Sequence, residues 1–159
     1  MAQFDKYTIK AQEAISEAQQ LALKQNHQEI KSEHLLLALI SQRDGIIPSV
    51  LAKLEIDIND LESFLEKRLT QLPRVEGGAG SQYIGNELNT VFNKATQEAS
   101  KMKDEYISTE HLLLALLELE DSTFSRYFKE RGISRDKVYQ ALMSIRGNQR
   151  ITDQNTEEK

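Results

Sequence analysis

The sequence predicts an all-α domain made of two pseudo-repeated four-helix units. The first observation is an internal repeat, because the segment IKSEHLLLALI at positions 30–40 returns as ISTEHLLLALL at positions 107–117. The same offset relates apolar positions on both sides of this segment without a gap, which is typical of one supersecondary unit used twice. The second observation is that apolar residues recur at helical spacing within each copy. Two such units are expected to bury a shared core.

The first helix of each copy is amphipathic. Its apolar positions are Ala11, Ala14, Ile15, Ala18, Leu21 and Ala22 in copy one, and Leu88, Val91, Phe92, Ala95, Ala99 and Met102 in copy two. Both sets follow the period of an α-helix with one buried face. Asp5 is expected to cap the helix of copy one, with Phe4 packing onto Ile9.

The second helix is the most apolar element of each copy. Ser32 and Thr109 are good N-caps, so the helix is expected to begin there in the two copies. The glutamate that follows, Glu33 or Glu110, favours the first turn because the helix dipole attracts negative charge. The leucine-rich body is apolar on more than one face, so this helix is expected to lie at the centre of the domain.

Two further amphipathic segments complete each unit. The third helix is expected over residues 48–54 and 124–131, and Gly132 suits a left-handed C-cap in copy two. The fourth helix is expected to begin at the N-caps Asp57 and Ser134. Its apolar residues are Leu61, Phe64, Leu65 and Leu69 in copy one, and Val138, Ala141, Leu142 and Ile145 in copy two.

The repeat sets the domain organisation. Copy one covers residues 5–71 and copy two covers residues 84–147, so that one helical domain spans residues 1–147. Residues 72–83 hold a proline, three glycines and a serine, and they are expected to form a flexible connector. Residues 148–159 are polar and lack periodicity, which predicts a disordered tail or a linker.

Composition narrows the function class. A formal net charge of −5, with both signs spread along the chain, lacks the basic stripe typical of nucleic-acid binding. The chain has no cysteine, which excludes disulfides and thiolate metal sites. The longest apolar run, residues 35–40, is far shorter than a membrane span, and the polar N-terminus argues against a signal peptide. We therefore expect a cytoplasmic helical domain that binds neither nucleic acid nor membrane.

The repeated Glu-His pairs are candidates for metal chemistry. A small metal-dependent enzyme would use Glu33, His34, Glu110 and His111 as ligands. Zinc sites usually need three or four converging groups, often two histidines one helical turn apart, whereas each helix here offers a single histidine. We therefore expect both histidines to be structural residues of the first turn. No metal, catalytic residue or cofactor is expected in this chain, whose connector glycines also lack the lysine of a phosphate-binding loop.

Three tyrosines are candidates for a binding rim. Tyr7 lies at the start of the first helix, Tyr83 lies beside the connector, and Tyr106 lies in the loop before the second helix of copy two. If the packing of the two copies brings these segments together, the tyrosines would form an amphipathic rim suited to peptide. The alternative is that they are scattered, half-buried side chains.

The EHLLLAL segment of both copies, preceded by Ser32 or by Thr109, resembles the Clp N domain, the double-repeat helical module at the front of Clp ATPases. Within that family, the opening residues 4–8 (FDKYT), the junction 72–77 (LPRVEG) and the exit near residues 145–154 are similar to the ClpB type of disaggregating chaperone. The resemblance covers essentially the whole chain.

The resemblance implies a larger parent protein. Members of the family are hexameric AAA+ ATPases, so it implies a homohexameric parent whose ATP and magnesium sites lie in domains beyond this chain. It implies that the module is a substrate-binding element, monomeric when isolated and joined by a flexible linker. Misfolded or aggregated polypeptides would be engaged here and threaded by the AAA+ ring, with help from the DnaK chaperone system. The ClpC and ClpA types imply the alternative of an adaptor-docking domain for a protease partner.

The resemblance also assigns residues. Family positions implicated in substrate handling match Thr8, Asp104 and Glu110, with the residue type retained at all three. These positions lie close in sequence to Tyr7 and Tyr106, the tyrosines singled out above. We therefore expect all five to belong to a substrate-binding site. The expected site is an exposed apolar groove near the loop before the second helix of copy two, rimmed by the three polar residues.

Overall fold

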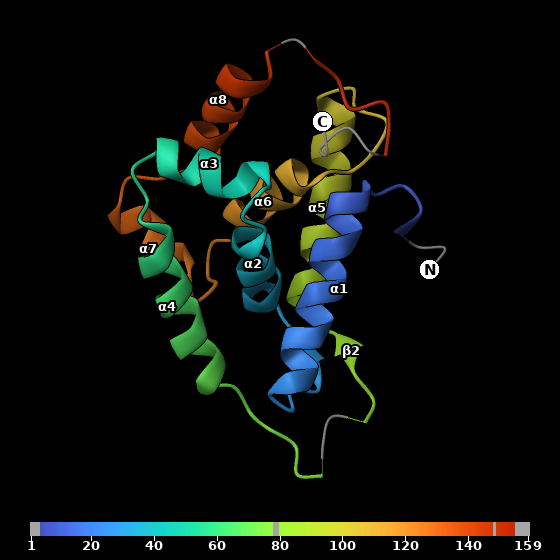
Figure 1. Ribbon diagram of the computed structural model, residues 1–159, viewed down its shortest axis with the longest axis vertical. Helices are drawn as coiled ribbons and strands as arrows, with labels where there is room; N and C mark the ends of the chain where they lie inside the picture. Colours follow the sequence, from blue (N-terminus) through green and yellow to red (C-terminus); the bar gives the residue numbers. More distant parts are fainter. Residues whose placement is uncertain (1–3, 78–79, 148, 155–159) are drawn as a thin grey trace.

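The computed structural model describes residues 4–77, 80–147 and 149–154, and within these ranges the chain is helical, as the sequence predicts. The helices are α1 (Ile9–Lys24), α2 (Ser32–Ser41), α3 (Ile46–Lys53), α4 (Ile58–Thr70), α5 (Asn86–Lys101), α6 (Thr109–Leu117), α7 (Ser125–Glu130) and α8 (Arg135–Arg146). Two short strands, β1 (Glu29–Ile30) and β2 (Tyr83–Ile84), accompany them. In Figure 1, α2 and α6 lie between α1 and α5 on one side and α4 and α7 on the other.

Side-chain caps define where several helices begin. Thr8 Oγ1 accepts a hydrogen bond from the Ala11 N–H at 3.2 Å, so that Thr8, and not Asp5, caps α1. Thr8 has the extended backbone that an N-cap requires, with ψ at 162°. Asp57 and Ser134 cap α4 and α8 as predicted.

The two central helices are capped by their own histidines. His34 Nδ1 accepts the Lys31 N–H at 2.9 Å, and His111 Nδ1 accepts the Ser108 N–H at 2.8 Å. The N-caps are therefore Lys31 and Ser108, one residue before the predicted caps, because a histidine at the third helical position satisfies the cap backbone. The structural role predicted for both histidines is confirmed by these contacts.

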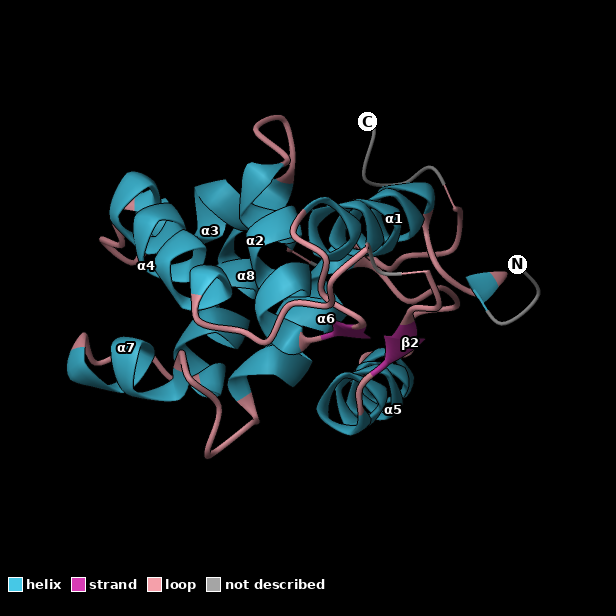
Figure 2. Cartoon of the chain, turned by 90° about the horizontal axis from the view of Figure 1, so that it is seen from below, coloured by secondary structure: helices cyan, strands magenta, loops and turns pink. Residues whose placement is uncertain are grey.

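The core sits where the two copies meet. All residues of α2 from Ser32 to Ile40 are buried, and so are those of α6 from Thr109 to Leu116, which confirms their central position. α1 packs on α2 and α5 packs on α6, while α6 also contacts α2 and α3 of the other copy. Viewed from below, α1 and α5 lie on either side of β2 (Figure 2).

The copies also exchange short extended segments. β1 and β2 pair in parallel, with Ile30 opposite Ile84. A parallel bridge joins Tyr7 to Ile107, and the repeat relates these two positions to Ile84 and Ile30. The segment before the first helix of each copy thus pairs with the segment before the second helix of the other. The sequence did not predict β1 and β2, because two-residue strands have no periodicity to read.

The C-terminal tail departs from the prediction. Residues 149–154 pack back onto the domain, where Ile151 is 2% exposed and the Ile9 N–H donates to the Gln154 carbonyl at 2.9 Å. The predicted linker therefore does not begin at residue 148. One apolar side chain and a few backbone hydrogen bonds hold a segment whose composition is polar. The rest of the predicted linker lies outside the described residues.

Within the described ranges no single helix has the length and hydropathy to cross a membrane. Only α2 and α3 taken together, across a bend of 92°, reach that length.

Candidate functional site

Each copy holds a buried pair in which a histidine ring meets a side chain from the loop before its helix. His34 Nε2 lies 2.9 Å from His27 Nδ1, and His111 Nε2 lies 2.8 Å from Asp104 Oδ2. Because both Nδ1 atoms accept a backbone N–H, each Nε2 carries the ring proton and donates it to its partner. The two pairs occupy equivalent positions of the repeat, but one joins two rings and the other joins a ring to a carboxylate.

The first pair is held in its neutral form. Burial, and then the neighbouring His27 ring, lower the pKa of His34 to about 4. Burial, and then the charge of Arg74, also lower the pKa of His27. Both rings are therefore uncharged at neutral pH, and their hydrogen bond joins α2 to the loop after α1.

The second pair belongs to a larger network centred on Asp104. While Oδ2 accepts from His111, Oδ1 accepts from the Ile151 N–H at 2.8 Å and from the Arg146 guanidinium. Burial alone would raise the pKa of this carboxyl, but these donors outweigh it and hold the pKa below its ordinary value. Arg146 also donates to Glu110 Oε2 at 2.8 Å. One arginine thus joins the start of α6, the loop before it and the end of α8.

This network corrects the predicted exposed rim. The side chains of Asp104 and Glu110 are 0% and 7% exposed, and Thr8 is fully buried beneath the first turn of α1. The carboxylates of Asp104 and Glu110 face inward because Arg146 neutralises both of them inside the domain. Copy one has Leu69 at the position equivalent to Arg146 and therefore lacks this contact. The structure therefore brings the resemblance-derived residues together as an internal support, and none of the three is an exposed contact surface.

The tyrosines are only partly brought together. Tyr7 pairs with Ile107, next to Tyr106, whereas Tyr83 lies in β2 opposite Glu29. Tyr7 is buried, and burial raises the pKa of its hydroxyl to about 12. Tyr106 is half-buried, and Tyr83 is 55% exposed. The predicted rim of three tyrosines is therefore wrong, although Tyr7 and Tyr106 do share one crossing of the two copies.

Sequence reasoning missed two residues of the network, Arg146 and Ile151. In the strict register of the repeat Arg146 corresponds to Leu69, which is fully buried. The order of the apolar residues instead matches Leu69 with Ile145, which is 45% exposed. The strict register would have shown an arginine at a core position, which is a signal of a buried ionic contact. No comparable signal marks Ile151, because the same offset aligns it with Arg74 of the polar connector.

The Glu-His pairs do not converge on a common point. Glu33 Oε2 accepts the Thr123 hydroxyl at 2.7 Å, while the adjacent His34 points to His27. Among the described residues, no three His, Asp or Glu side chains are placed to hold a metal ion.

A groove between α6, α7 and the start of α8 has a volume of about 520 Å³, and we call it the α6–α7 groove. It is lined by the apolar side chains of Leu117, Leu119, Phe124, Phe128 and Ile133. Charged residues of both signs edge it, namely Glu120, Asp121, Lys129 and Arg135. Leu117 is half-buried here, whereas Ile40, its equivalent in copy one, is fully buried. The two copies therefore differ in apolar exposure at this place.

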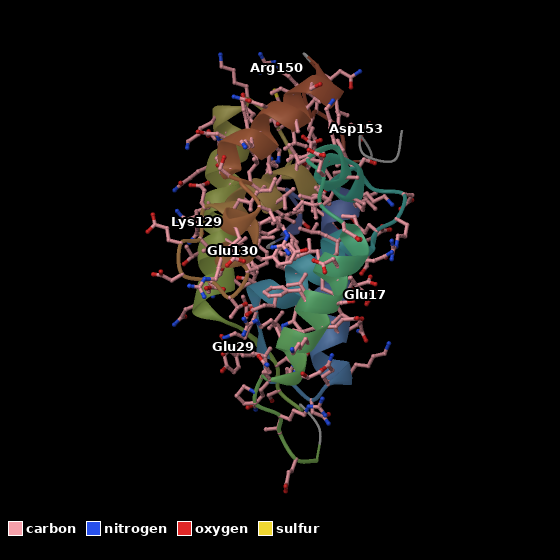
Figure 3. The ribbon with its side chains drawn as sticks, turned by 90° about the vertical axis from the view of Figure 1, so that its left-hand side faces the viewer. Glu17, Glu29, Lys129, Glu130, Arg150 and Asp153 are labelled. Carbon is pink, nitrogen blue, oxygen red and sulfur yellow. The ribbon has the colours of Figure 1, made fainter. Side chains whose placement is uncertain are left out.

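A second hollow, of about 330 Å³, lies beside the loop at residues 104–110, and we call it the α5–α8 hollow. Its apolar lining is Met102, Tyr139 and Met143, and its charged lining is Lys101, Lys103, Arg146 and Arg150. A hollow therefore lies near the expected place, but its edges are cationic. In Figure 3, Arg150 lies at the end of the molecule, well above Lys129 of the α6–α7 groove, and the two hollows share no lining residue.

The family model described as the Clp repeat (R) N-terminal domain matches residues 6–131 of this chain. The ClpB chaperone of Bacillus anthracis is 41% identical over 153 residues, which cover 94% of this chain and 18% of that protein. The ClpB chaperone of Vibrio vulnificus is 41% identical over 154 residues, covering 97% of this chain and again 18% of the relative. The chain thus spans less than a fifth of the length of these curated relatives.

The solved structures agree with this match. The Hsp104 N-terminal domain from Candida albicans superimposes with a TM-score of 0.83 at 26% identity, covering 96% of this chain and 99% of that one. The N-terminal domain of the ClpV1 ATPase from E. coli gives a TM-score of 0.76 at 25% identity, covering 89% and 86% of the two chains. Because the family model matches most of the chain and the helical fold agrees with these domains, the chain belongs to the Clp repeat N-terminal domain family.

Proposed function

We propose that this domain is the substrate-binding N-terminal domain of an ATP-dependent disaggregating chaperone of the ClpB type. It engages exposed apolar segments of misfolded or aggregated polypeptides and passes them to an AAA+ ring. The 41% identity to ClpB chaperones supports the parent, and the separate α6–α7 groove supports the binding activity.

The α6–α7 groove is the observation that carries the binding role. Its apolar lining gives the burial that an exposed leucine or phenylalanine of a misfolded chain gains on binding. Its edge of mixed charge imposes no strong selection by charge, which suits a domain that meets many sequences. Each contact is small and therefore weak, and several domains on one ring raise the effective concentration around an aggregate.

The residues assigned through the family resemblance keep an indirect role in this proposal. Thr8, Asp104 and Glu110 fix the start of α1, the loop before α6 and the tail, so they orient the surfaces around them. Tyr7 packs beneath the same crossing, and the half-buried Tyr106 is the one member of the set with substantial surface beside the loop. Substitution of the three polar residues is therefore expected to act on stability first and on binding as a consequence.

The chemistry of the parent lies outside this chain in the proposal. ATP and magnesium bind in the AAA+ domains that follow, the parent is a cytoplasmic homohexamer, and the DnaK system delivers substrates to it. The domain itself is a monomer without catalytic residues, metal or cofactor. The polar tail beyond Gln154 connects it to the ring.

Adaptor docking is the second candidate, and one relative favours it. A ClpV N-domain in complex with a VipB peptide shares the fold, with a TM-score of 0.73 at 17% identity over 89% of this chain and 88% of that one. A domain of this fold can thus hold a defined peptide of a partner protein. The two candidates differ in the partner, because an adaptor binds as a folded protein with fixed stoichiometry.

The test replaces an apolar side chain of the groove and measures binding to a reduced, carboxymethylated, permanently unfolded model protein. Leu119→Ser should weaken binding several-fold, because Leu119 is half-buried in the groove and its apolar area is lost. The matched control is Leu23→Ser on α1, 43% exposed and not part of the groove, which should bind as the parent domain does. Equal binding by both variants, with melting curves showing both folded, would remove the groove from the proposal. Binding of a folded partner only would favour the adaptor candidate.

A further inference from the structure

The α5–α8 hollow carries charge of one sign. Its charged lining residues are Lys101, Lys103, Arg146 and Arg150, and no carboxylate is among its lining residues. This is unusual in a chain that has 25 acidic and 20 basic residues and a net charge of −5. The hollow is therefore positively charged, although the chain as a whole has a net negative charge.

Three of the four cations are available to a ligand. Arg146 is 6% exposed and already paired with Asp104 and Glu110. The side chains of Lys101, Lys103 and Arg150 are exposed, and Arg150 is fixed by its hydrogen bond to the Met102 carbonyl at 3.0 Å. Lys101 also lies close to Glu98 and Glu118, and Arg135 donates to Glu98 at 3.0 Å.

The ends of two helices moderate this positive charge without cancelling it. α5 and α8 both end at the hollow, and the carbonyl ends of their dipoles bring a partial negative charge. The Gly147 N–H donates to the Met143 carbonyl, and the Arg150 guanidinium donates to the Met102 carbonyl. These two carbonyl oxygens therefore already accept a hydrogen bond. Each helix end contributes about half an elementary charge, against three full exposed charges.

The floor of the hollow is apolar and adaptable. Met102, Tyr139 and Met143 are all half-buried, and two of them are unbranched thioethers that adjust to the shape of a bound side chain. A volume of about 330 Å³ accommodates one or two large side chains. The hollow therefore offers an apolar contact at its centre and cationic contacts at its edge.

The hollow between α4 and α7 provides an internal comparison, because its lining holds the carboxylates Asp60 and Glu130 together with four cations, of which Lys67 and Arg68 are two. There Arg131 lies 3.4 Å from Asp60, and Arg126 lies 3.8 Å from Glu130. Carboxylates therefore stand among the cations of that hollow, whereas none lines the α5–α8 hollow. Within the described chain, the α5–α8 hollow is thus the better candidate for a ligand of definite charge.

We propose that the α5–α8 hollow binds peptide segments in which one or two large apolar side chains are flanked by carboxylates. The apolar side chain contacts Met102, Tyr139 and Met143, and the flanking carboxylates pair with Lys101, Lys103 and Arg150. This site is separate from the α6–α7 groove and adds a charge preference that the groove does not have. Its existence does not depend on the attached ring or on the proposed disaggregating function.

The experiment measures fluorescence anisotropy of three labelled peptides with the whole domain. The first has a leucine–phenylalanine pair flanked on each side by two glutamates, the second has lysines in place of the glutamates, and the third has glycines in place of the apolar pair. Only the first should bind well, and its affinity should fall steeply with added salt, because exposed charges are screened. Equal binding of the lysine peptide would overturn the proposal.

Variants locate the site. The double variant Lys101→Gln, Lys103→Gln should weaken binding of the acidic peptide several-fold, since both side chains are exposed and their removal leaves the fold intact. Lys129→Gln, an exposed lysine of the α6–α7 groove, is the matched control and should bind normally, as should Leu119→Ser. Unchanged binding by the double variant would overturn the proposal, and loss of binding by Leu119→Ser alone would move the peptide to the groove. Tighter binding of a single-stranded oligonucleotide than of the acidic peptide would overturn it in favour of a nucleic-acid site.

Discussion

At the scale of single residues, the two copies place different chemistry on one backbone. The His27–His34 pair and the Asp104–His111 pair have the same geometry, yet only the second contains a charge. Burial and the neighbouring positive charges lower the pKa of both rings of the first pair, so a proton on either ring is disfavoured in the folded domain. Acid should therefore weaken the domain at this pair of copy one.

The first prediction concerns acid sensitivity. The pKa of His34 in the folded domain is about 4, below its ordinary value of 6.5, so the unfolded chain binds the proton more readily. The stability that this ring contributes is complete above pH 6.5 and falls as the pH drops toward 4. Urea unfolding should show a loss of roughly 2 kcal/mol between pH 7 and pH 5.

The control for this prediction is His34→Gln, which removes the titrating ring. This variant should lose the part of the slope between pH 7 and pH 5 that His34 contributes. A parent domain with flat stability over that range would contradict the assignment of neutral, buried rings.

The second prediction concerns a left-handed residue after the third helix. Glu55 has φ at 66°, and its equivalent in copy two is Gly132 with φ at 70°. A side chain in this conformation costs about 1–2 kcal/mol, and the added flexibility of glycine in the unfolded chain offsets about half of the gain. Glu55→Gly should therefore raise stability by about 0.5–1 kcal/mol in urea unfolding. Gly132→Ala should do the opposite, and destabilisation by Glu55→Gly would show that the exposed glutamate makes a contact of value.

At the scale of elements, repeated patterns were predictable and single contacts were not. The positions of α1, α4, α5 and α8 follow from apolar spacing and caps that the sequence displays. The groove near the 104–110 loop was predicted to have Asp104 and Glu110 on its edge. Both side chains instead point into the domain, where they accept hydrogen bonds from Arg146 of α8. The strict register places Arg146 at the buried position of Leu69, but matching the apolar residues in order passed over this signal. The tail was predicted to be unstructured because its composition is polar. Contacts made by one residue have no period, so periodicity cannot find them.

The third prediction concerns the tail. Removal of residues 149–159 should lower the melting temperature, because it exposes the site of Ile151 and leaves Asp104 without one of its donors. The burial of one isoleucine is worth about 1.5–3 kcal/mol. Removal of residues 155–159 alone is the matched control and should leave the melting temperature unchanged. Equal melting temperatures for both truncations, measured by circular dichroism, would contradict the packing of the tail.

At the scale of the whole molecule, the two copies are not independent units. β1 pairs with β2, Tyr7 pairs with Ile107, and α6 contacts both α2 and α3. Each copy thus leaves a large apolar face that only the other copy covers. The sequence predicts the pseudo-symmetry of the two copies. It does not predict that each copy pairs a short extended segment with the other, which only the structure shows.

The fourth prediction follows from this shared core. A fragment of residues 1–77 should show no cooperative unfolding transition, because the central helix α2 would expose the side that α6 covers. The complete domain should unfold in a single transition in differential scanning calorimetry. A monomeric fragment with its own sharp transition would show that copy one folds alone and would contradict the account of a shared core.

The docked tail has a mechanical consequence. Tension applied to the chain beyond Gln154 reaches the domain first at the hydrogen bond to the Ile9 N–H, and next at the bonds of Ile151 with Asp104 and Glu105. These hydrogen bonds lie beside the start of α1 and the loop before α6. The force is therefore transmitted to Asp104, which also binds Arg146. The α6–α7 groove is lined by residues at the opposite ends of α6 and α8, Leu117 and Arg135. A partner pulling on the tail would therefore act first on Asp104 and Arg146, and on the groove only through the length of these two helices.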